Sequence, residues 1–255
     1  TMDYTVATFK ERPDLFQQQE EICGRAFPEF LYYSDAAAAF WEKMISYYGD
    51  FQFLLLEQDH VAAVINCLPM DLDMTVDALP DDAFDWAFEK SIKDYEDGKK
   101  LNAAMGVQII VPEAYQGKGV SGAAVKALKK ECAQKGLEKV IIPVRPTLKS
   151  RYPLQSMEDY IRWNRDDGLP LDAWLRVHVR CKGRIVKVCS NAVEIRASIG
   201  QWEKWTRMTF PDSGEYVVEG ALCPVVIDKE QGLGRYVEPN VWVSYDLKRR
   251  SIWRK

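Results

Sequence analysis

Two closely spaced glycines, Gly117 and Gly119, lie in the segment of this sequence that is best suited to binding an anionic group. Consecutive backbone N–H groups can converge on a phosphate where no Cβ obstructs the approach, and a helix that begins directly afterwards adds the positive end of its dipole. Apolar residues recur at helical spacing from Val120 to Cys132. The segment therefore predicts a phosphate-binding turn at the start of a helix.

Known phosphate-binding loops differ in their spacing, which separates them here. A Walker-type loop requires Ser or Thr after Gly-Lys, whereas Lys118 is followed by Gly119. The dinucleotide fingerprint is matched literally by Gly117, Gly119 and Gly122, but it should open the first β-α-β unit and precede an acidic residue at the end of the next strand. The next predicted strand runs instead into Arg145. Neither loop type is favoured.

Residues 111–121, Val-Pro-Glu-Ala-Tyr-Gln-Gly-Lys-Gly-Val-Ser, resemble the signature of the GNAT superfamily of acyl-coenzyme A-dependent N-acyltransferases. In that signature Arg or Gln is followed by x-x-G-x-G/A, after a strand that often ends in Val and Pro. Gln116 fills the first position and Gly119 the glycine, whereas Ser121 replaces the usual Gly or Ala. The order of predicted elements over residues 1–200 is also similar to the GNAT order.

The predicted elements alternate around this turn. The opening reads β-α-α-β-β, with a tight hairpin at Gln58-Asp59, and a helix follows. A strand at residues 101–111, the turn, a helix and the strand Lys139–Val144 then form a β-α-β unit with a right-handed crossover. Residues 184–198 predict either one long strand or a hairpin bent near Ser190. A short helix and further strands follow, at residues 201–208, 216–218, 224–228 and 241–245.

The resemblance implies a fold of the α/β (α+β mixed) class, the GNAT fold. It has a central mixed β-sheet with a splayed parallel pair and flanking helices, here with a C-terminal β-rich addition. We expect residues 1–200 to form the acyltransferase core. Residues 201–255 are expected to form an extension of the same compact domain that completes or covers the sheet and the acceptor site.

The resemblance also implies acetyl-coenzyme A or another acyl-coenzyme A as co-substrate, and no metal. The backbone of Ile109, Ile110 and Val111 would pair with the pantetheine arm, and the strand Lys139–Val144 would splay away to admit it. An amine would attack the thioester directly, while a backbone N–H stabilises the oxyanion and an acid protonates the thiolate. The residues expected around the pyrophosphate are Gln116, Gly117, Lys118, Gly119, Val120, Ser121 and Gly122.

The acid that many GNAT proteins use is missing from its usual place. It is a tyrosine four residues before a glycine, and Val179 occupies that position before Gly183. His178 is one replacement, although a lone histidine among apolar neighbours is more often structural. Tyr152, which follows the splayed strand, is another, unless it is a packing aromatic. Carboxylates that could serve as a base are Glu57, Asp71 and Asp73.

Polar residues around Pro239 form the candidate acceptor site, because packing alone does not explain them. The residues are Arg235, Tyr236, Glu238 and Asn240. They lie in the C-terminal addition, beyond what a minimal GNAT fold needs. Covering of a sheet edge is the alternative role of this segment.

Composition excludes several classes of function. The chain has 255 residues, a net charge of -4 and a pI of about 5.4, so no overall basic field attracts nucleic acid or an anionic membrane. Its apolar runs are too short to cross a bilayer, and no leader pattern follows Thr1, which predicts a cytoplasmic protein. The six cysteines include no C-x-x-C pair and predict reduced, mostly structural thiols.

Three functions remain open. The first is an N-acyltransferase that moves an acetyl or other small acyl group from coenzyme A to an amine of a small metabolite, by direct attack in a ternary complex. The second takes its acyl group from an acyl carrier protein, for which Arg145, Lys149 and Arg151 would form a basic docking surface. The third is a non-catalytic coenzyme A-binding module, because the usual tyrosine is absent. The sequence also leaves a homodimer open.

Overall fold

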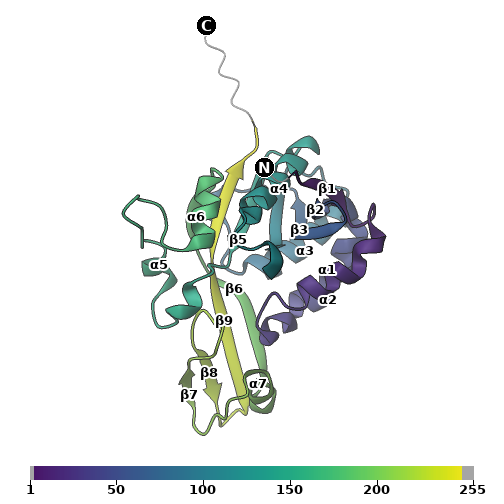
Figure 1. Cartoon of the computed structure of the whole chain (residues 1–255). Helices are drawn as coiled ribbons and strands as arrows, with labels where there is room; N and C mark the ends of the chain where they lie inside the picture. The colour runs from purple at the N-terminus through teal and green to yellow at the C-terminus, as the bar shows by residue number, and fades with distance from the viewer. Residues whose placement is uncertain (1–2, 249–255) are drawn as a thin grey trace.

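Nine strands form one mixed sheet in this computed structural model, which describes residues 3–248. The strand order is β1-β2-β3-β4-β5-β9-β8-β7, and β6 pairs with β9 (Figure 1). The strands are β1 (Thr5–Thr8), β2 (Gln52–Glu57), β3 (His60–Met70), β4 (Ala103–Ile110), β5 (Lys139–Val144), β6 (Arg184–Ser198), β7 (Gly214–Tyr216), β8 (Val225–Asp228) and β9 (Leu233–Asp246). The predicted hairpin is confirmed, since Glu57 pairs with His60 across Gln58 and Asp59.

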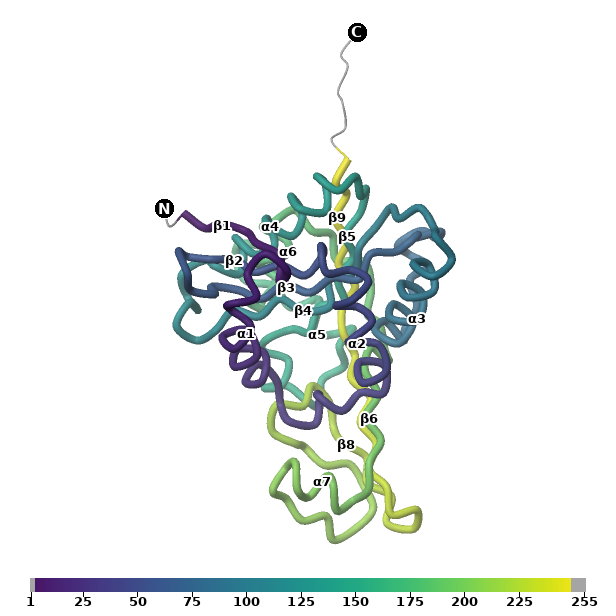
Figure 2. The backbone as a smooth tube through the Cα atoms, turned by 90° about the vertical axis from the view of Figure 1, so that its right-hand side faces the viewer, coloured from purple at the N-terminus to yellow at the C-terminus, as the bar shows by residue number. Residues whose placement is uncertain are grey.

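Helices cover both faces of the sheet, which confirms the predicted mixed architecture. The α-helices are α1 (Phe16–Cys23), α2 (Asp35–Tyr47), α3 (Ala83–Glu96), α4 (Val120–Gln134), α5 (Met157–Tyr160), α6 (Ala173–Arg180) and α7 (Ile199–Thr206). Short 3-10 helices lie at η1 (Pro13–Leu15), η2 (Glu29–Tyr33), η3 (Gly49–Phe51), η4 (Val76–Ala78), η5 (Glu113–Tyr115) and η6 (Lys149–Arg151). Figure 2 shows α1 and α2 on one side of the central strands.

The face of the sheet that carries α4 is built from alternate residues of the strands. Val120, Ala124 and Leu128 recur every four residues along α4 and are buried against the sheet. The other face packs α1 and the pair α2 and α3 in separate apolar clusters. Because successive strand residues point to opposite faces, each central strand contributes to both layers.

The parallel pair β4 and β5 separates part of the way along its length. Its ladder ends where Met105 pairs with Ile141, although β4 continues to Ile110 and β5 to Val144. Beyond that point β5 stays paired with β9 on its other side. The predicted splay is therefore present, and it leaves one edge of the second half of β4 without a strand partner.

Strand β9 is much longer than the predicted strand at residues 241–245. It has 14 residues, and its far edge pairs first with β8 and then with β5. Pro239 lies in the middle of β9. A proline cannot donate to a strand ladder, but this proline occupies a position that pairs with no strand. The segment 184–198 is one strand with an irregularity between Cys189 and Val193, rather than a hairpin.

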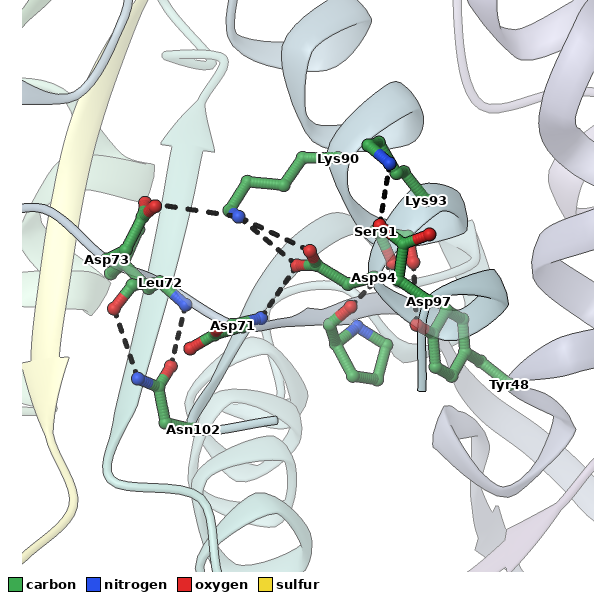
Figure 3. A network of polar contacts seen from close by, with 11 residues as sticks. Tyr48, Asp71, Leu72, Asp73, Lys90, Ser91, Lys93, Asp94, Asp97 and Asn102 are labelled. Carbon is green, nitrogen blue, oxygen red and sulfur yellow. Dashed lines mark hydrogen bonds and ion pairs between the residues drawn. The ribbon is translucent and has the colours of Figure 1, made fainter. Parts of the chain in front are cut away.

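A network of polar contacts fixes α3 to the loop that follows β3 (Figure 3). Asp94 accepts from the N–H of Asp71 at 2.8 Å and forms an ion pair with Lys90, which also lies 3.9 Å from Asp73. Asn102 exchanges two hydrogen bonds with the backbone of Leu72. Since β4 starts directly after Asn102, this network is at the paired end of β4, away from the splay.

Within residues 3–248, no helix is long and apolar enough to span a bilayer. The same part of the chain contains no cluster of His, Cys, Asp and Glu side chains that could hold a metal ion.

Candidate functional site

The glycine turn has the backbone conformation that its residues predict. Gly117 and Gly119 have φ angles of 73° and 77°, in the left-handed region that favours glycine. Gly119 is the N-cap residue of α4. A Cβ built on either glycine would meet no atom within 4 Å, so the turn exposes bare backbone to an approaching ligand.

The backbone N–H groups of this turn are available to a ligand. Those from Gly117 to Gly122 donate to no acceptor in the described part of the chain, because a helix leaves its first amides unpaired. The N–H of Gln116 differs, since it donates to the carbonyl of Glu113 at 3.1 Å. An anion here would meet several converging donors and the positive end of the α4 dipole.

Side chains of the turn hold its shape rather than fill it. The Tyr115 hydroxyl donates to Glu57 at 2.9 Å, and Lys118 lies 5.5 Å from the centroid of the Tyr115 ring. The Gln116 side chain donates to the carbonyl of Val111 at 3.1 Å. Glu57 is therefore a structural acceptor on β2. The other two candidate bases, Asp71 and Asp73, belong to the network in Figure 3.

The splayed half of β4 leads into the turn. The register against β3 shifts between Asn66 and Cys67, so Val107 is an extra residue that bulges the strand. The residues from Gly106 to Ile110 have no partner on the β5 side. Their free N–H and C=O groups could pair with an extended ligand such as pantetheine, because an unpaired strand edge is a template for another extended chain.

A buried charge cluster, the Arg145 cluster, lies just beyond the end of β5. The Arg145 Nε donates to both carboxylate oxygens of Glu238, at 3.0 and 3.1 Å, and Nη2 donates to the carbonyl of Gly220 at 2.6 Å. Glu238 also accepts from the Tyr236 hydroxyl at 2.6 Å and from Asn240 at 3.1 Å. The cluster fills the stretch of β9 that lies between its pairing with β8 and its pairing with β5.

The Arg145 cluster is tied to the segment that joins α1 and α2. The ring of Tyr236 packs edge-on against Phe30 of η2 at 5.1 Å, and its hydroxyl accepts from the N–H of Leu222.

Lys149 is fully buried and donates to the carbonyls of Tyr152 and Leu222, at 2.8 and 2.7 Å. Burial lowers the pKa of this ammonium.

The predicted acceptor residues divide into two groups. Tyr236, Glu238 and Asn240 come together in the Arg145 cluster, but each is almost completely buried, and the Tyr236 hydroxyl and the Asn240 amide both donate to Glu238. Arg235 points to the other side of β9 and forms an ion pair with Glu194 at 2.8 Å. Within the Arg145 cluster, the Arg145 side chain is the more accessible part, with 23% of it exposed.

The basic surface expected for a carrier protein does not form. Lys149 is buried, and Arg145 is paired with Glu238. Of the predicted set, Arg151 alone is exposed, so these three residues do not form an exposed basic surface.

His178 lies in an apolar part of the core. Its Nδ1 is 2.6 Å from the Tyr245 hydroxyl, and Tyr245 pairs with Val140, at the end of β5 that stays joined to β4. Burial lowers the pKa of the imidazole to about 3, so it is neutral near pH 7. We therefore assign His178 no part in the chemistry, because its imidazole is neutral and buried.

Tyr152 is more accessible. It is 39% exposed, and its ring packs edge-on against Trp163 at 5.0 Å. Its hydroxyl has no hydrogen-bond partner among the described residues. Its backbone carbonyl is held by Lys149, which fixes the position of the segment after β5.

Sequence reasoning missed two polar side chains of this region. Gln108 lies on the splayed half of β4, and the sequence pattern predicts Arg145 only as part of a docking surface. A charged residue directly after a strand as apolar as Lys139–Val144 was the available sign for Arg145. Nothing in the sequence alone singles out Gln108, because its partners lie on other strands.

Comparisons with known proteins agree with the fold. No family model matches the chain. An arginine N-acetyltransferase of Aspergillus versicolor, AvaD, is 27% identical over 96% of this chain and 94% of its own length. The loading GNATL domain of CurA from Lyngbya majuscula superposes with a TM-score of 0.58, at 17% identity over 96% of this chain and 98% of that one.

A further solved structure, the GphF GNAT-like decarboxylase in complex with isobutyryl-CoA, has a TM-score of 0.56. It is 15% identical, over 96% of this chain and 100% of that one. At this level of identity the two solved structures establish the fold. Together with the left-handed glycine turn and the splayed strands, they show that the chain has the GNAT fold.

Proposed function

We propose that this protein transfers an acetyl or other small acyl group from coenzyme A to an amine of a small metabolite, by direct attack in a ternary complex. The observation that carries the proposal is the row of unpaired amides from Gly117 to Gly122, at the start of α4 and beside the splay of β4 and β5. A pyrophosphate and an extended pantetheine arm are the ligand parts that these two features suit.

The donor would lie along β4. The pantetheine arm would pair with the backbone of Ile109, Ile110 and Val111, although one lone pair of the Val111 carbonyl is already used by Gln116. The pyrophosphate would take the free amides that begin at Gly117. A backbone N–H near the bulge at Val107 would stabilise the oxyanion, because the bulge turns a strand group out of the ladder.

The acceptor would bind at the Arg145 cluster. Nη1 of Arg145 has no partner among the described residues, and a guanidinium in a fixed orientation suits a carboxylate. Glu238, Tyr236 and Asn240 would position this guanidinium rather than touch the ligand, since they are buried. The name of the fungal relative suggests L-arginine, which carries both an α-carboxylate and amines, as the first acceptor to test.

Tyr152 would protonate the departing thiolate. Support comes from its exposed hydroxyl and from its place in the segment that follows the splayed strand. The proton passes from the phenol to sulfur as the C–S bond breaks, and the amine loses its surplus proton to water.

The test incubates the purified protein with acetyl-coenzyme A and L-arginine, then with ornithine, lysine, agmatine and simple arylalkylamines. Liquid chromatography with mass spectrometry would measure free coenzyme A and the acetylated amine together. We expect both products in equal amounts with at least one amino acid. Tight binding of acetyl-coenzyme A in calorimetry without any acylated amine would contradict the proposed reaction.

A further inference from the structure

Three side-chain amides form a row across β2, β3 and β4. Gln52 pairs with Asn66 in the register of the sheet, and Asn66 pairs with Gln108. Gln52 and Asn66 are completely buried, and Gln108 is half-buried. A row of buried amides is costly unless every member is hydrogen-bonded, so its geometry is strongly constrained.

Backbone groups fix which way each amide points. The Gln52 Nε2 donates to the carbonyls of Tyr48 and Cys67, at 3.0 and 2.8 Å. Its Oε1 therefore accepts, from the Cys67 N–H at 3.1 Å and from the Asn66 Nδ2 at 2.9 Å. A flip of Gln52 would place its NH₂ group against an N–H and its oxygen against two carbonyls.

The orientation of the Gln52 amide also fixes the orientations of the Asn66 and Gln108 amides. Because Asn66 uses its NH₂ group toward Gln52, its Oδ1 accepts from the Gln108 Nε2, at 2.8 Å. That Nε2 also lies 3.8 Å from the sulfur of Cys23 on α1. The Gln108 Oε1 accepts no hydrogen bond from any residue in the described range. The row thus leaves a carbonyl oxygen free on the splayed half of β4.

The position of this oxygen relates it to the reaction. Gln108 directly follows the bulged Val107, and it lies on the half of β4 that has no β5 partner. Its side chain is on the face that packs α1, the face on which Tyr236 meets Phe30 of the α1–α2 connection. The free oxygen and the Arg145 cluster are therefore on the same face of the sheet.

We propose that the Gln108 Oε1 accepts a hydrogen bond from the attacking amine and orients its lone pair toward the thioester carbonyl. This inference rests on the proposed acyl transfer. An amide oxygen is too weak a base to take the proton, so Gln108 positions the nucleophile while the N–C bond forms, the C–S bond breaks and the amine proton goes to water. The ligand class is a neutral primary amine, which has two N–H groups and can donate one of them to Gln108 while its lone pair attacks.

The first test compares Gln108→Met with the unchanged enzyme, with acetyl-coenzyme A and the best amine of the panel. We expect kcat/KM for the amine to fall about 10- to 100-fold, since the hydrogen bond that orients the amine is lost. The Kd for acetyl-coenzyme A in calorimetry should stay within about twofold. Gln17→Met, on the exposed side of α1, is the matched control.

The second test uses the row itself. Asn66→Leu frees the Gln108 amide to rotate, and it should lower kcat/KM for the amine about 3- to 10-fold. The double variant Asn66→Leu with Gln108→Met should be no slower than Gln108→Met alone, because Asn66 acts only through Gln108. If the two substitutions instead acted through independent structural effects, their fold-losses in kcat/KM would multiply in the double variant.

The outcomes separate this inference from the reaction on which it depends. Normal amine kcat/KM in a folded Gln108→Met variant, or multiplying losses in the double variant, would overturn the role of Gln108 while leaving acyl transfer intact. If the unchanged enzyme acylates no amine of the panel, the proposed reaction fails, and the role of Gln108 fails with it.

Discussion

The glycine turn and the Arg145 cluster lie at opposite sides of the β4–β5 splay and are built in opposite ways. The turn comes from consecutive residues, and its amides from Gly117 to Gly122 donate to no acceptor within residues 3–248. The Arg145 cluster joins residues 93 positions apart in the chain, and Arg145, Tyr236 and Asn240 all donate to the buried Glu238. One region offers free donors, and the other presents a single fixed guanidinium.

This difference separates two ways of preparing a binding site. Unpaired amides at a helix start stay solvated and cost little until an anion displaces the water. A buried carboxylate must be satisfied in the folded protein itself, so Glu238 is held by Arg145, Tyr236 and Asn240 before any ligand arrives. Substitutions in the turn should therefore affect ligand binding mainly, whereas substitutions in the cluster should affect both stability and acceptor binding.

The largest effect is expected from Gly119→Trp. The indole would cover the free amides, so the Kd for acetyl-coenzyme A should rise at least about 100-fold, which corresponds to about 2.7 kcal/mol. The left-handed φ of 77° adds about 1–2 kcal/mol of destabilisation. Gly136→Trp is the matched control, because Gly136 has a φ of 82°, follows the other end of α4 and also has open space around its Cβ. Equal loss of affinity in both variants, measured by calorimetry, would refute the role of the turn.

The next effect concerns Tyr152→Phe, which keeps the ring packed on Trp163 and removes only the hydroxyl. If the phenol protonates the thiolate, kcat should fall about 100-fold while the Kd for acetyl-coenzyme A is unchanged. Tyr33→Phe provides the comparison, since Tyr33 is 54% exposed and packs on Trp205. A kcat for Tyr152→Phe within about threefold of normal would remove Tyr152 from the mechanism and leave the thiolate to water.

Arg145→Leu tests the cluster directly. It should raise the KM for L-arginine about 10- to 100-fold through loss of the carboxylate partner. It should also lower the free energy of unfolding by about 2–3 kcal/mol, because Glu238 stays buried without its cation. This loss is smaller than for a fully buried ion pair, because Arg145 is partly exposed to solvent.

The control for Arg145 is Arg235→Leu on the same strand system. Arg235 pairs with Glu194 at the surface, so urea unfolding should shift by less than about 1 kcal/mol and the KM should not change. Similar kinetic losses in the two arginine variants would indicate a general effect of charge rather than a site at Arg145.

The smallest effect on activity is expected at His178, a buried polar residue outside both regions. Its folded pKa of about 3 is below its ordinary value of 6.5, so the unfolded chain binds the proton first as pH falls. The stability from the neutral imidazole is fully present above pH 6.5 and is lost at about 1.4 kcal/mol per pH unit as pH falls toward 3.

His178→Phe should therefore flatten the pH dependence of urea unfolding between about pH 6 and pH 4.5, while kcat changes little. His60→Gln, at the exposed start of β3, should leave that pH dependence as it is. A large loss of kcat in folded His178→Phe would return the histidine to the list of catalytic groups.

Much of the fold was predictable because its elements are set by neighbouring residues. The turn at Gly117 and Gly119 follows from their freedom at positive φ, and α4 follows from the spacing of its apolar residues. The hairpin at Gln58 and the β-α-β unit follow from similarly local patterns. The length of β9 did not follow, because Pro239 resembles a strand end until it is placed opposite the irregularity in β6.

The sequence by itself determined the left-handed glycine turn and the helix that follows it, because a few consecutive residues make both. Only the tertiary structure decided which polar side chains meet. Long-range strand pairing placed Glu238 against Arg145 and Gln52 in line with Gln108, and it set His178 against Tyr245 in the buried core. Cross-strand contacts depend on register, and register is set by the whole buried face of the sheet rather than by any one segment.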